Sequence, residues 1–171
     1  MIVADTSALI SLTIADSFSI VLDEYDIHTT QMVVDELENT AAYDDSHGRA
    51  ADDVLRQIGR VTIHEVSDLP LSSTRIDEGE ASCLALTDES EATFLLTDDL
   101  RALPELQAAT DTQVAISPIV LKALVTRDVI TTAEATERLD QLAVTRDWLG
   151  APIYRRARQL FDDGVLVLWQ A

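Results

Sequence analysis

MIVADTSAL, residues 1–9, places a short apolar run directly before one acidic and two hydroxyl residues. The run Ile2–Ala4 predicts a buried strand, because a strand covered on both faces carries continuous apolar side chains. Asp5, Thr6 and Ser7 favour the start of a helix, since their side chains accept hydrogen bonds from the free amides of a first turn. The segment therefore predicts a strand that leads into a helix, with a carboxylate at the junction.

The same alternation of strand and helix continues along the chain. Four more strands are predicted at Ile27–Thr29, Val61–Val66, Phe94–Thr97 and Val114–Ser117. Helices are predicted between them at Ser7–Tyr25 with a break near Asp16, Thr30–Tyr43, Gly48–Ile58, Glu78–Glu89 and Leu100–Ala109. This alternation predicts an α/β fold with a parallel sheet of five strands.

The chain is predicted to be helical after its last strand. Pro118 suits the first turn of a helix, and helical patterns follow at Ile119–Val125, Thr132–Val144 and Ile153–Phe161. No linker rich in Gly, Ser or Pro divides the chain, so we expect one domain over residues 1–171, with a core at 1–117 and a helical extension at 118–171. The apolar stretch Gly164–Trp169 is expected to lie in the core rather than at an interface.

The composition is strongly acidic. Thirty-one Asp and Glu face twelve basic residues, of which only Lys122 is a lysine, and the net charge is -19. Such a surface is expected of a protein adapted to high intracellular salt, where repulsion between carboxylates is screened. With no apolar run long enough for a membrane span, no leader pattern and the single Cys83, we expect a cytoplasmic protein without a membrane partner.

Several kinds of site are excluded by missing motifs. The five glycines form neither a dinucleotide-binding nor a P-loop pattern, and no serine lies in a GxSxG motif. Cys83 lies among small apolar residues and is predicted to belong to the core. The spacing of His28, His47 and His64 fits no zinc motif, so each is predicted to be structural or solvated. The carboxylates remain as the candidates for chemistry.

Acidic residues follow two of the predicted strands directly. Asp5 follows the first strand, and Asp98 and Asp99 follow Phe94–Thr97. Ligands of open α/β sheets bind at the carboxyl ends of strands, where strand order reverses. If the two strands are neighbours, their carboxylates repel one another unless they are protonated or bridged by cations, and Mg²⁺ or Mn²⁺ is the natural bridge.

Helix capping is the alternative explanation for these acids. Asp5 and either Asp98 or Asp99 are suitable N-caps, and Asp77 with Glu80 has the spacing of a capping box. In the helix that contains VVDEL, residues 33–37, Val33, Val34 and Leu37 define the buried face, and Glu36 and Glu38 lie on its opposite flanks. The residues alone leave both explanations open.

Taken in order, the motifs resemble those of a PIN domain. The motifs are an apolar strand followed by DTSAL, a helix with VVDEL, a helix that opens with GEASCLAL, and a strand that ends in LLTDD. The resemblance covers about residues 1–117 and is to compact prokaryotic PIN proteins related to VapC-type toxin ribonucleases, in a branch with a GEA motif. It implies a three-layer fold with helices on both faces of a parallel sheet of order 3-2-1-4-5.

The resemblance also implies site residues and an activity. The four acidic motif positions fall on Asp5, Glu36, Glu80 and Asp99, with Asp98 as an adjacent alternative ligand and Asp99 favoured. Asp5, Glu80, Asp98 and Asp99 are thus expected to hold Mg²⁺ or Mn²⁺, and Thr6 and Ser7 to help bind metal or phosphate. The implied reaction is metal-dependent cleavage of single-stranded RNA by a toxin that forms a homodimer and is neutralised by a small antitoxin.

The net charge opposes general binding of nucleic acid. High salt weakens phosphate contacts further, so we expect RNA binding that depends on cations. Arg101 and the cluster Arg155, Arg156 and Arg158 are candidate backbone contacts, and a solvated helix face explains the cluster equally well. The alternative function is a catalytically silent PIN-like protein that acts by association with a partner. The enzyme is preferred because all four acidic positions are filled.

Overall fold

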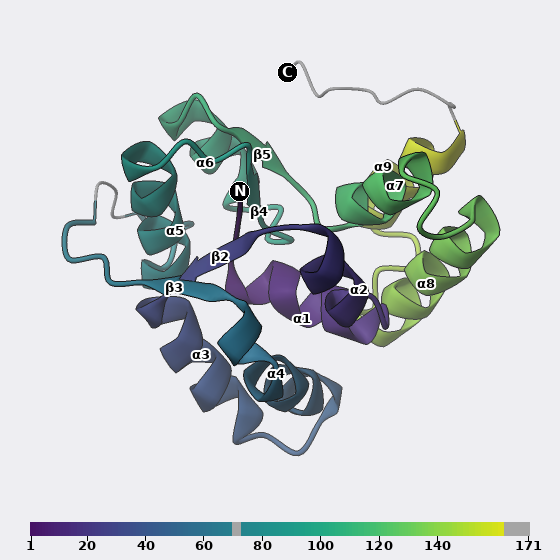
Figure 1. Cartoon of the computed structure of the whole chain (residues 1–171), viewed down its shortest axis with the longest axis horizontal. Helices are drawn as coiled ribbons and strands as arrows, with labels where there is room; N and C mark the ends of the chain where they lie inside the picture. Colours follow the sequence, from purple (N-terminus) through teal and green to yellow (C-terminus); the bar gives the residue numbers. More distant parts are fainter. Residues whose placement is uncertain (70–72, 163–171) are drawn as a thin grey trace.

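Five parallel strands form one sheet in the order β3-β2-β1-β4-β5 (Figure 1). The computed structural model describes residues 1–69 and 73–162. The strands are β1 (Ile2–Ala4), β2 (Ile27–Thr30), β3 (Thr62–His64), β4 (Phe94–Leu96) and β5 (Gln113–Ala115). The expected strand order is confirmed.

The register between β1 and β4 determines where the chemistry lies. Ala4 pairs with Leu96, and the Asp5 N–H donates to the Leu96 carbonyl at 3.1 Å. The residues after both strands therefore leave the same edge of the sheet side by side. The two strands that are followed by Asp5 and by Asp98 and Asp99 are therefore neighbours in the sheet, as the hypothesis of a cation site requires.

Helices cover the sheet on both faces. The helices of the first part are α1 (Thr6–Ile14), α2 (Phe18–Glu24), α3 (Gln31–Ala41), α4 (Ser46–Arg56), α5 (Glu78–Glu89) and α6 (Leu103–Ala109), with a short 3₁₀ turn at Ile58–Arg60. Figure 1 shows α5 and α6 on one side of the sheet and α1 and α2 on the other. Helix α5 packs on β1, β2 and β4, while α3 contacts both β2 and α5. The three-layer α/β fold is confirmed.

The predicted elements are found with small shifts at their ends. Strand β3 is shorter than the predicted Val61–Val66, because only its three central residues pair with β2. Helix α6 begins at Leu103 rather than Leu100, since residues 100–102 form a turn stabilised by the Leu103 N–H bond to the Asp99 carbonyl at 3.0 Å. Cys83 is fully buried in the core, as predicted.

A sharp bend separates α1 from α2, as the break near Asp16 predicts. Asp16 has a φ of 48°, in the left-handed region that Asp tolerates better than most residues, and the Ser17 N–H donates to the Leu12 carbonyl at 2.9 Å. Among the described residues no single helix is long and apolar enough to cross a bilayer; α1 and α2 meet that length and composition only as a pair, bent by 111°.

Three helices follow β5 and pack beside α1 and α2 (Figure 1). They are α7 (Pro118–Thr126), with Pro118 in its first turn, α8 (Thr132–Thr145) and α9 (Pro152–Asp162). Helix α8 contacts α1, and the Arg138 guanidinium donates to the Ala15 carbonyl at 3.2 Å. The stretch Gly164–Trp169 lies outside the described residues.

Candidate active site

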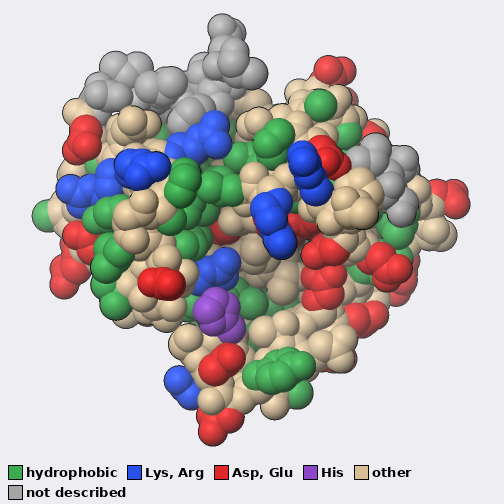
Figure 2. All heavy atoms as spheres, turned by 180° about the vertical axis from the view of Figure 1, so that it is seen from behind, with side chains coloured by type: hydrophobic (Ala, Val, Ile, Leu, Met, Phe, Trp, Pro, Cys, Tyr) green, Lys and Arg blue, Asp and Glu red, His purple; other side chains and the backbone are tan. Residues whose placement is uncertain are grey.

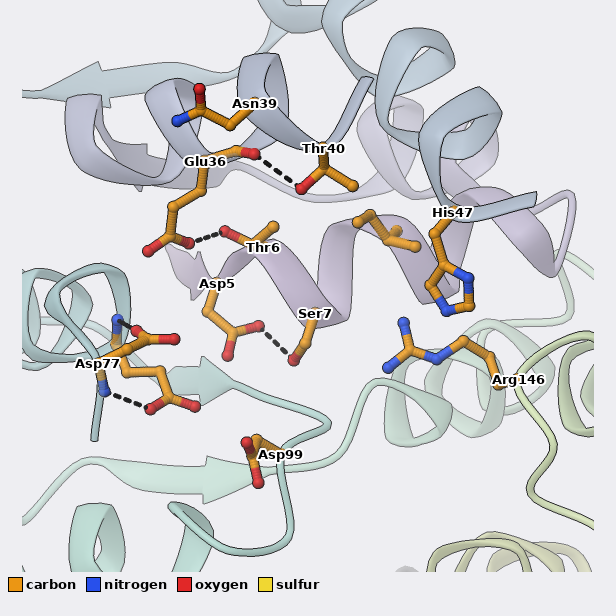
Figure 3. Close-up of a pocket in the computed structure, with 12 residues that line it drawn as sticks. Asp5, Thr6, Ser7, Glu36, Asn39, Thr40, His47, Asp77, Asp99 and Arg146 are labelled. Carbon is orange, nitrogen blue, oxygen red and sulfur yellow. Dashed lines mark hydrogen bonds between the residues drawn. The ribbon is translucent and has the colours of Figure 1, made fainter. Parts of the chain in front are cut away.

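A cleft of about 440 Å³ opens at the carboxyl ends of the central strands (Figure 3). Its walls come from α1, α3, α4, the start of α5, the segment after β4 and the end of α8. The lining residues are Asp5, Thr6, Ser7, Ile10, Glu36, Asn39, Thr40, His47, Asp77, Glu80, Asp99 and Arg146. Five carboxylates thus share one cleft, including all four that the motif resemblance selects.

Asp5 lies at the base of the cleft and also caps α1. Its Oδ1 accepts hydrogen bonds from the Ala8 N–H and the Ser7 hydroxyl, both at 2.8 Å. Burial raises the pKa of Asp5 from 3.8 to about 7, against hydrogen bonds from Thr97, Ala8 and Ser7 that lower it. Capping and a role in the cleft therefore coexist in one carboxylate whose ionised form is poorly stabilised.

Glu36 is held in place by α1 and α5. Its Oε2 accepts from the Thr6 hydroxyl, and its Oε1 accepts from the Gly79 N–H at 3.1 Å. A Cβ on Gly79 would lie 2.3 Å from Oε1, so the glycine of the GEA motif allows the carboxylate to approach the helix backbone. Burial raises the pKa of Glu36, partly offset by the bond from Thr6. Thr6 therefore positions Glu36 from across the cleft.

Glu80 combines a capping box with a place in the cleft. Its Oε2 accepts from the Asp77 N–H at 3.0 Å, and Asp77 Oδ1 accepts from the Glu80 N–H at 2.8 Å. Burial raises the pKa of Glu80 to about 8, and the nearby charges of Asp77, Asp5 and Asp99 add to the rise. The capping box predicted at this spacing is present, and it fixes Glu80 facing the other acids.

Asp98 turns away from the cleft toward β5. Its carboxylate accepts from the Ser117 N–H at 2.8 Å and the Ser117 hydroxyl at 2.7 Å, and its own N–H donates to the Ser7 hydroxyl at 2.8 Å. Asp98 is buried and is not among the residues that line the cleft. It ties the ends of β4 and β5 together, so the geometry separates it from the three other expected ligands.

Asp99 lines the cleft but is already paired with Arg101. The Arg101 Nη2 lies 2.8 Å from Asp99 Oδ2, and the Arg101 N–H donates to Oδ1 at 2.7 Å. These bonds hold the pKa of Asp99 below its ordinary value. Arg101 does not line the cleft, and its side chain is 84% exposed. The structure therefore places Arg101 as a partner of a cleft acid rather than in the cleft itself.

The donor set fits a hard divalent cation. Asp5, Glu80 and Asp99 offer carboxylate oxygens, the ligands that Mg²⁺ and Mn²⁺ prefer. Burial is the main cause of the raised pKa values of Asp5 and Glu80, and nearby carboxylates add a smaller repulsion that a cation would relieve. Within residues 1–69 and 73–162, no three acidic, His or Cys side chains converge at metal-binding spacing. Cation binding therefore requires these side chains to turn toward one another.

The wall of the cleft opposite Asp77 and Glu80 was not expected from the sequence. Asn39 and Thr40 line it, and their positions three and four residues after Glu36 were a usable signal, because such residues share a helix face. His47 and Arg146 lie together at the far end (Figure 3). No local pattern indicated them, since α4 and α8 meet the cleft only through the tertiary fold.

The remaining arginine candidates lie elsewhere. Arg155 donates to the Gly150 carbonyl at 3.0 Å, and Arg158 donates to Asp140 at 3.2 Å. Arg156 lies beside a small hollow next to β5. None of these three arginines lines the carboxylate cleft.

A parallel sheet of order 3-2-1-4-5 with acidic side chains gathered at its carboxyl edge defines an α/β protein with a candidate metal-dependent active site. The model of the family DUF3368, described as a PIN domain, matches residues 1–163, and the chain belongs to this family. No curated protein matches the sequence. PIN domains are generally nucleases, which are hydrolases, and typically use divalent metals.

Proposed function

We propose that this chain is a divalent-metal-dependent endoribonuclease that hydrolyses phosphodiester bonds of single-stranded RNA. The observation that carries the proposal is the meeting of Asp5, Glu36, Glu80 and Asp99 in one cleft. Two of these acids have pKa values raised to about 7 and about 8. Carboxyl groups whose ionised form is destabilised are typical of a functional site rather than of a solvated surface.

Each acid has a distinct part in this proposal. Asp5, Glu80 and Asp99 would hold Mg²⁺ or Mn²⁺, and the cation would supply the Lewis acidity that activates water and offsets the charge of the phosphodiester. Glu36 has one further lone pair on each oxygen beyond its bonds to Thr6 and Gly79. It is therefore our candidate to orient the attacking water.

Ser7 supports Asp5 rather than substrate in this arrangement. Its hydroxyl donates to Asp5 Oδ1 and accepts from the Asp98 N–H, both at 2.8 Å. Thr6 is engaged in the same way with Glu36. The two hydroxyls named as ligands of metal or phosphate are thus proposed to act by positioning two of the carboxylates.

The proposal extends to the biological setting. The resemblance to VapC-type proteins supports a cytoplasmic toxin that forms a homodimer and is neutralised by a small antitoxin. The net charge of -19 with a single lysine supports activity at high salt. A short reading frame directly upstream of the gene is the expected genomic sign of the antitoxin.

Cleavage of end-labelled single-stranded RNA in molar KCl tests the activity. Wild type is compared in Mn²⁺, Mg²⁺ and EDTA with Asp5→Asn and Glu80→Gln, which keep the size of each side chain and remove its charge. Asp35→Asn is the matched control, because Asp35 is exposed on the same helix as Glu36 and does not line the cleft. We expect metal-dependent cleavage by wild type and the control, and loss of about a hundredfold or more in both cleft variants.

Two outcomes would contradict the proposal. Cleavage that persists in EDTA would exclude the metal-dependent mechanism. Folded wild type that neither cleaves several RNAs nor is stabilised by a divalent ion would instead support a silent protein that acts by association. Glu80→Gln that cleaves as wild type does would limit Glu80 to its capping box.

A further inference from the structure

The carboxylate cleft has a cationic end that the proposed chemistry does not yet use. Arg146 and His47 line the cleft from α8 and α4, and their side chains lie beside one another (Figure 3). Figure 2 shows Lys or Arg and His side chains around a hollow, with Asp and Glu side chains across from them. The cleft therefore has two walls of opposite electrostatic character.

Arg146 is placed by the way α8 ends. The Arg146 N–H donates to the Leu142 carbonyl at 2.9 Å, and the Trp148 N–H reaches back to Ala143 at 2.7 Å across Asp147, whose φ is 54°. Trp148 is buried, and the Arg146 guanidinium carbon lies 5.5 Å from the centre of its ring. This helix end holds the arginine over an aromatic ring, and among residues 1–69 and 73–162 no acceptor is paired with its five side-chain N–H donors.

In the part of the chain that the structure describes, Arg146 also differs from most arginines in its ion pairing. Ion pairs with carboxylates of the described residues are formed by Arg49, Arg56, Arg60, Arg75, Arg101, Arg127, Arg138 and Arg158. Within residues 1–69 and 73–162, Arg146 forms no ion pair with any carboxylate, although it borders an acidic cleft. A half-buried guanidinium with free donors is a binding group for a planar or tetrahedral anion.

His47 adds a donor of another kind to the same wall. It lies in the first turn of α4, where Asp45 Oδ1 accepts the Gly48 N–H at 2.8 Å. Burial, together with the adjacent charge of Arg146, lowers the pKa of His47. The imidazole is therefore neutral at neutral pH and offers a hydrogen bond without a second positive charge.

We propose that Arg146 and His47 form a phosphate-binding wall that grips the RNA backbone on the side of the cleft opposite the carboxylates. This inference rests on the proposed function, because it names how the substrate of that site is held. Arg146 offers two parallel N–H donors to the non-bridging oxygens of a phosphate, and His47 offers one more. The strand is then held between a cation-loaded acidic wall and a wall that needs no cation.

Such a wall explains how a chain with a net charge of -19 can bind RNA at all. A single well-placed arginine contacts phosphate in any sequence, so it contributes affinity without base specificity. Removing it should weaken the binding of all RNAs alike and should lower the dependence of binding on salt. These two signs distinguish a phosphate contact from a merely structural arginine.

An RNA-binding assay tests the phosphate-binding wall. The probe is a short fluorescent RNA with slowly hydrolysed phosphorothioate linkages, and its binding is measured by fluorescence anisotropy in Mn²⁺ over a series of KCl concentrations. The variants are Arg146→Met, Arg146→Lys and His47→Gln. Arg56→Met is the matched control, because it removes the same charge from a residue that is exposed on α4, the helix that carries His47, and that does not line the cleft. Thermal unfolding of each variant shows that it is folded.

We expect Arg146→Met to bind about tenfold or more weakly than wild type, with the slope of log affinity against log salt reduced by about 0.7. Arg146→Lys should recover part of the affinity, because it restores the charge without the paired donors. His47→Gln should weaken binding severalfold, and Arg56→Met should match wild type.

Equal affinity and equal salt slope in Arg146→Met and Arg56→Met would overturn the inference, and so would wild type that binds no RNA in Mn²⁺. Cleavage of ordinary RNA, measured in parallel, separates this result from the fate of the proposed function. If Arg146→Met cleaves RNA with an unchanged KM, the proposed nuclease function stands and the phosphate-binding wall is refuted. If RNA binding depends on Arg146 but no cleavage is detected, the phosphate-binding wall stands and the proposed nuclease function is refuted.

Discussion

Replacing Asp5 with Asn should stabilise the metal-free protein at alkaline pH. Asp5 is only 3% exposed, and burial raises its pKa from 3.8 to about 7. Each pKa unit corresponds to 1.36 kcal/mol, so the ionised carboxylate costs about 4 kcal/mol of folding free energy. Asn is as good an N-cap as Asp and keeps an oxygen for the Ala8 N–H, so the substitution removes the charge and preserves the bond.

The sign of the pH dependence follows from the direction of the shift. Between 3.8 and about 7 the folded chain keeps the Asp5 proton and the unfolded chain has lost it, so the stability of wild type falls as pH rises through this range and then levels off. The advantage of Asp5→Asn is therefore about 4 kcal/mol near pH 8, about 2 kcal/mol near pH 5, and absent below both pKa values. Near pH 8 this corresponds to roughly 8–16 °C in Tm.

Urea unfolding in molar KCl with EDTA, followed by tryptophan fluorescence, measures these differences. Asp35→Asn is the control and should change stability by no more than about 0.5 kcal/mol. Mn²⁺ should stabilise wild type more than Asp5→Asn and should narrow the gap near pH 8. A variant no more stable than wild type in EDTA near pH 8, or an advantage equal at both pH values, would refute the electrostatic reasoning.

Four further substitutions, at three positions in or beside the cleft, test the assigned roles. Gly79→Ala should keep stability within about 1 kcal/mol, because the Glu36 side chain can swing away from the new methyl group, yet it should lower the cleavage rate about tenfold or more by losing the position of that carboxylate; an unchanged rate would deny Glu36 a role. Asp98→Ala should cost about 2–3 kcal/mol in urea unfolding by orphaning the Ser117 N–H, and Asp98→Asn should leave Mn²⁺ affinity within about twofold by calorimetry, whereas loss of Mn²⁺ binding would make it a ligand. Arg101→Gln should tighten Mn²⁺ binding about threefold by removing a competing positive charge, and weaker binding would contradict that competition.

Local patterns predicted the elements of this fold because each element is defined by neighbours in sequence. The run Ile2–Ala4 and the helix Glu78–Glu89 are found with the predicted bounds. The ends of β3 were less predictable, because β3 is an edge strand whose pairing depends on β2 alone. Strand order came from the resemblance to a family, since periodicity does not say which strands are neighbours.

The candidate site divides in the same way. The adjacency of Asp5 and Asp99 could be expected from two strand ends, and the resemblance to a family favoured Asp99 over Asp98. The contact that turns Asp98 away could not be predicted, because it involves Ser117 on the next connection. Capping and cleft roles also could not be separated from the sequence, because Asp5 has both. Arg146 was beyond prediction, since only the packing of α8 on α1 brings it to the cleft.

The placement of the two walls along the chain has a consequence for synthesis. In the order of synthesis Arg146 follows Asp5 by about 140 residues, on the order of ten seconds at typical elongation rates. A ribonuclease is synthesised on an RNA template. The proposed contact between Arg146 and the phosphate backbone can form only after α8 has folded. On the proposed function, the carboxylates of the cleft are therefore synthesised before the residue that binds the phosphate backbone, and the growing chain cannot yet bind the messenger RNA that encodes it.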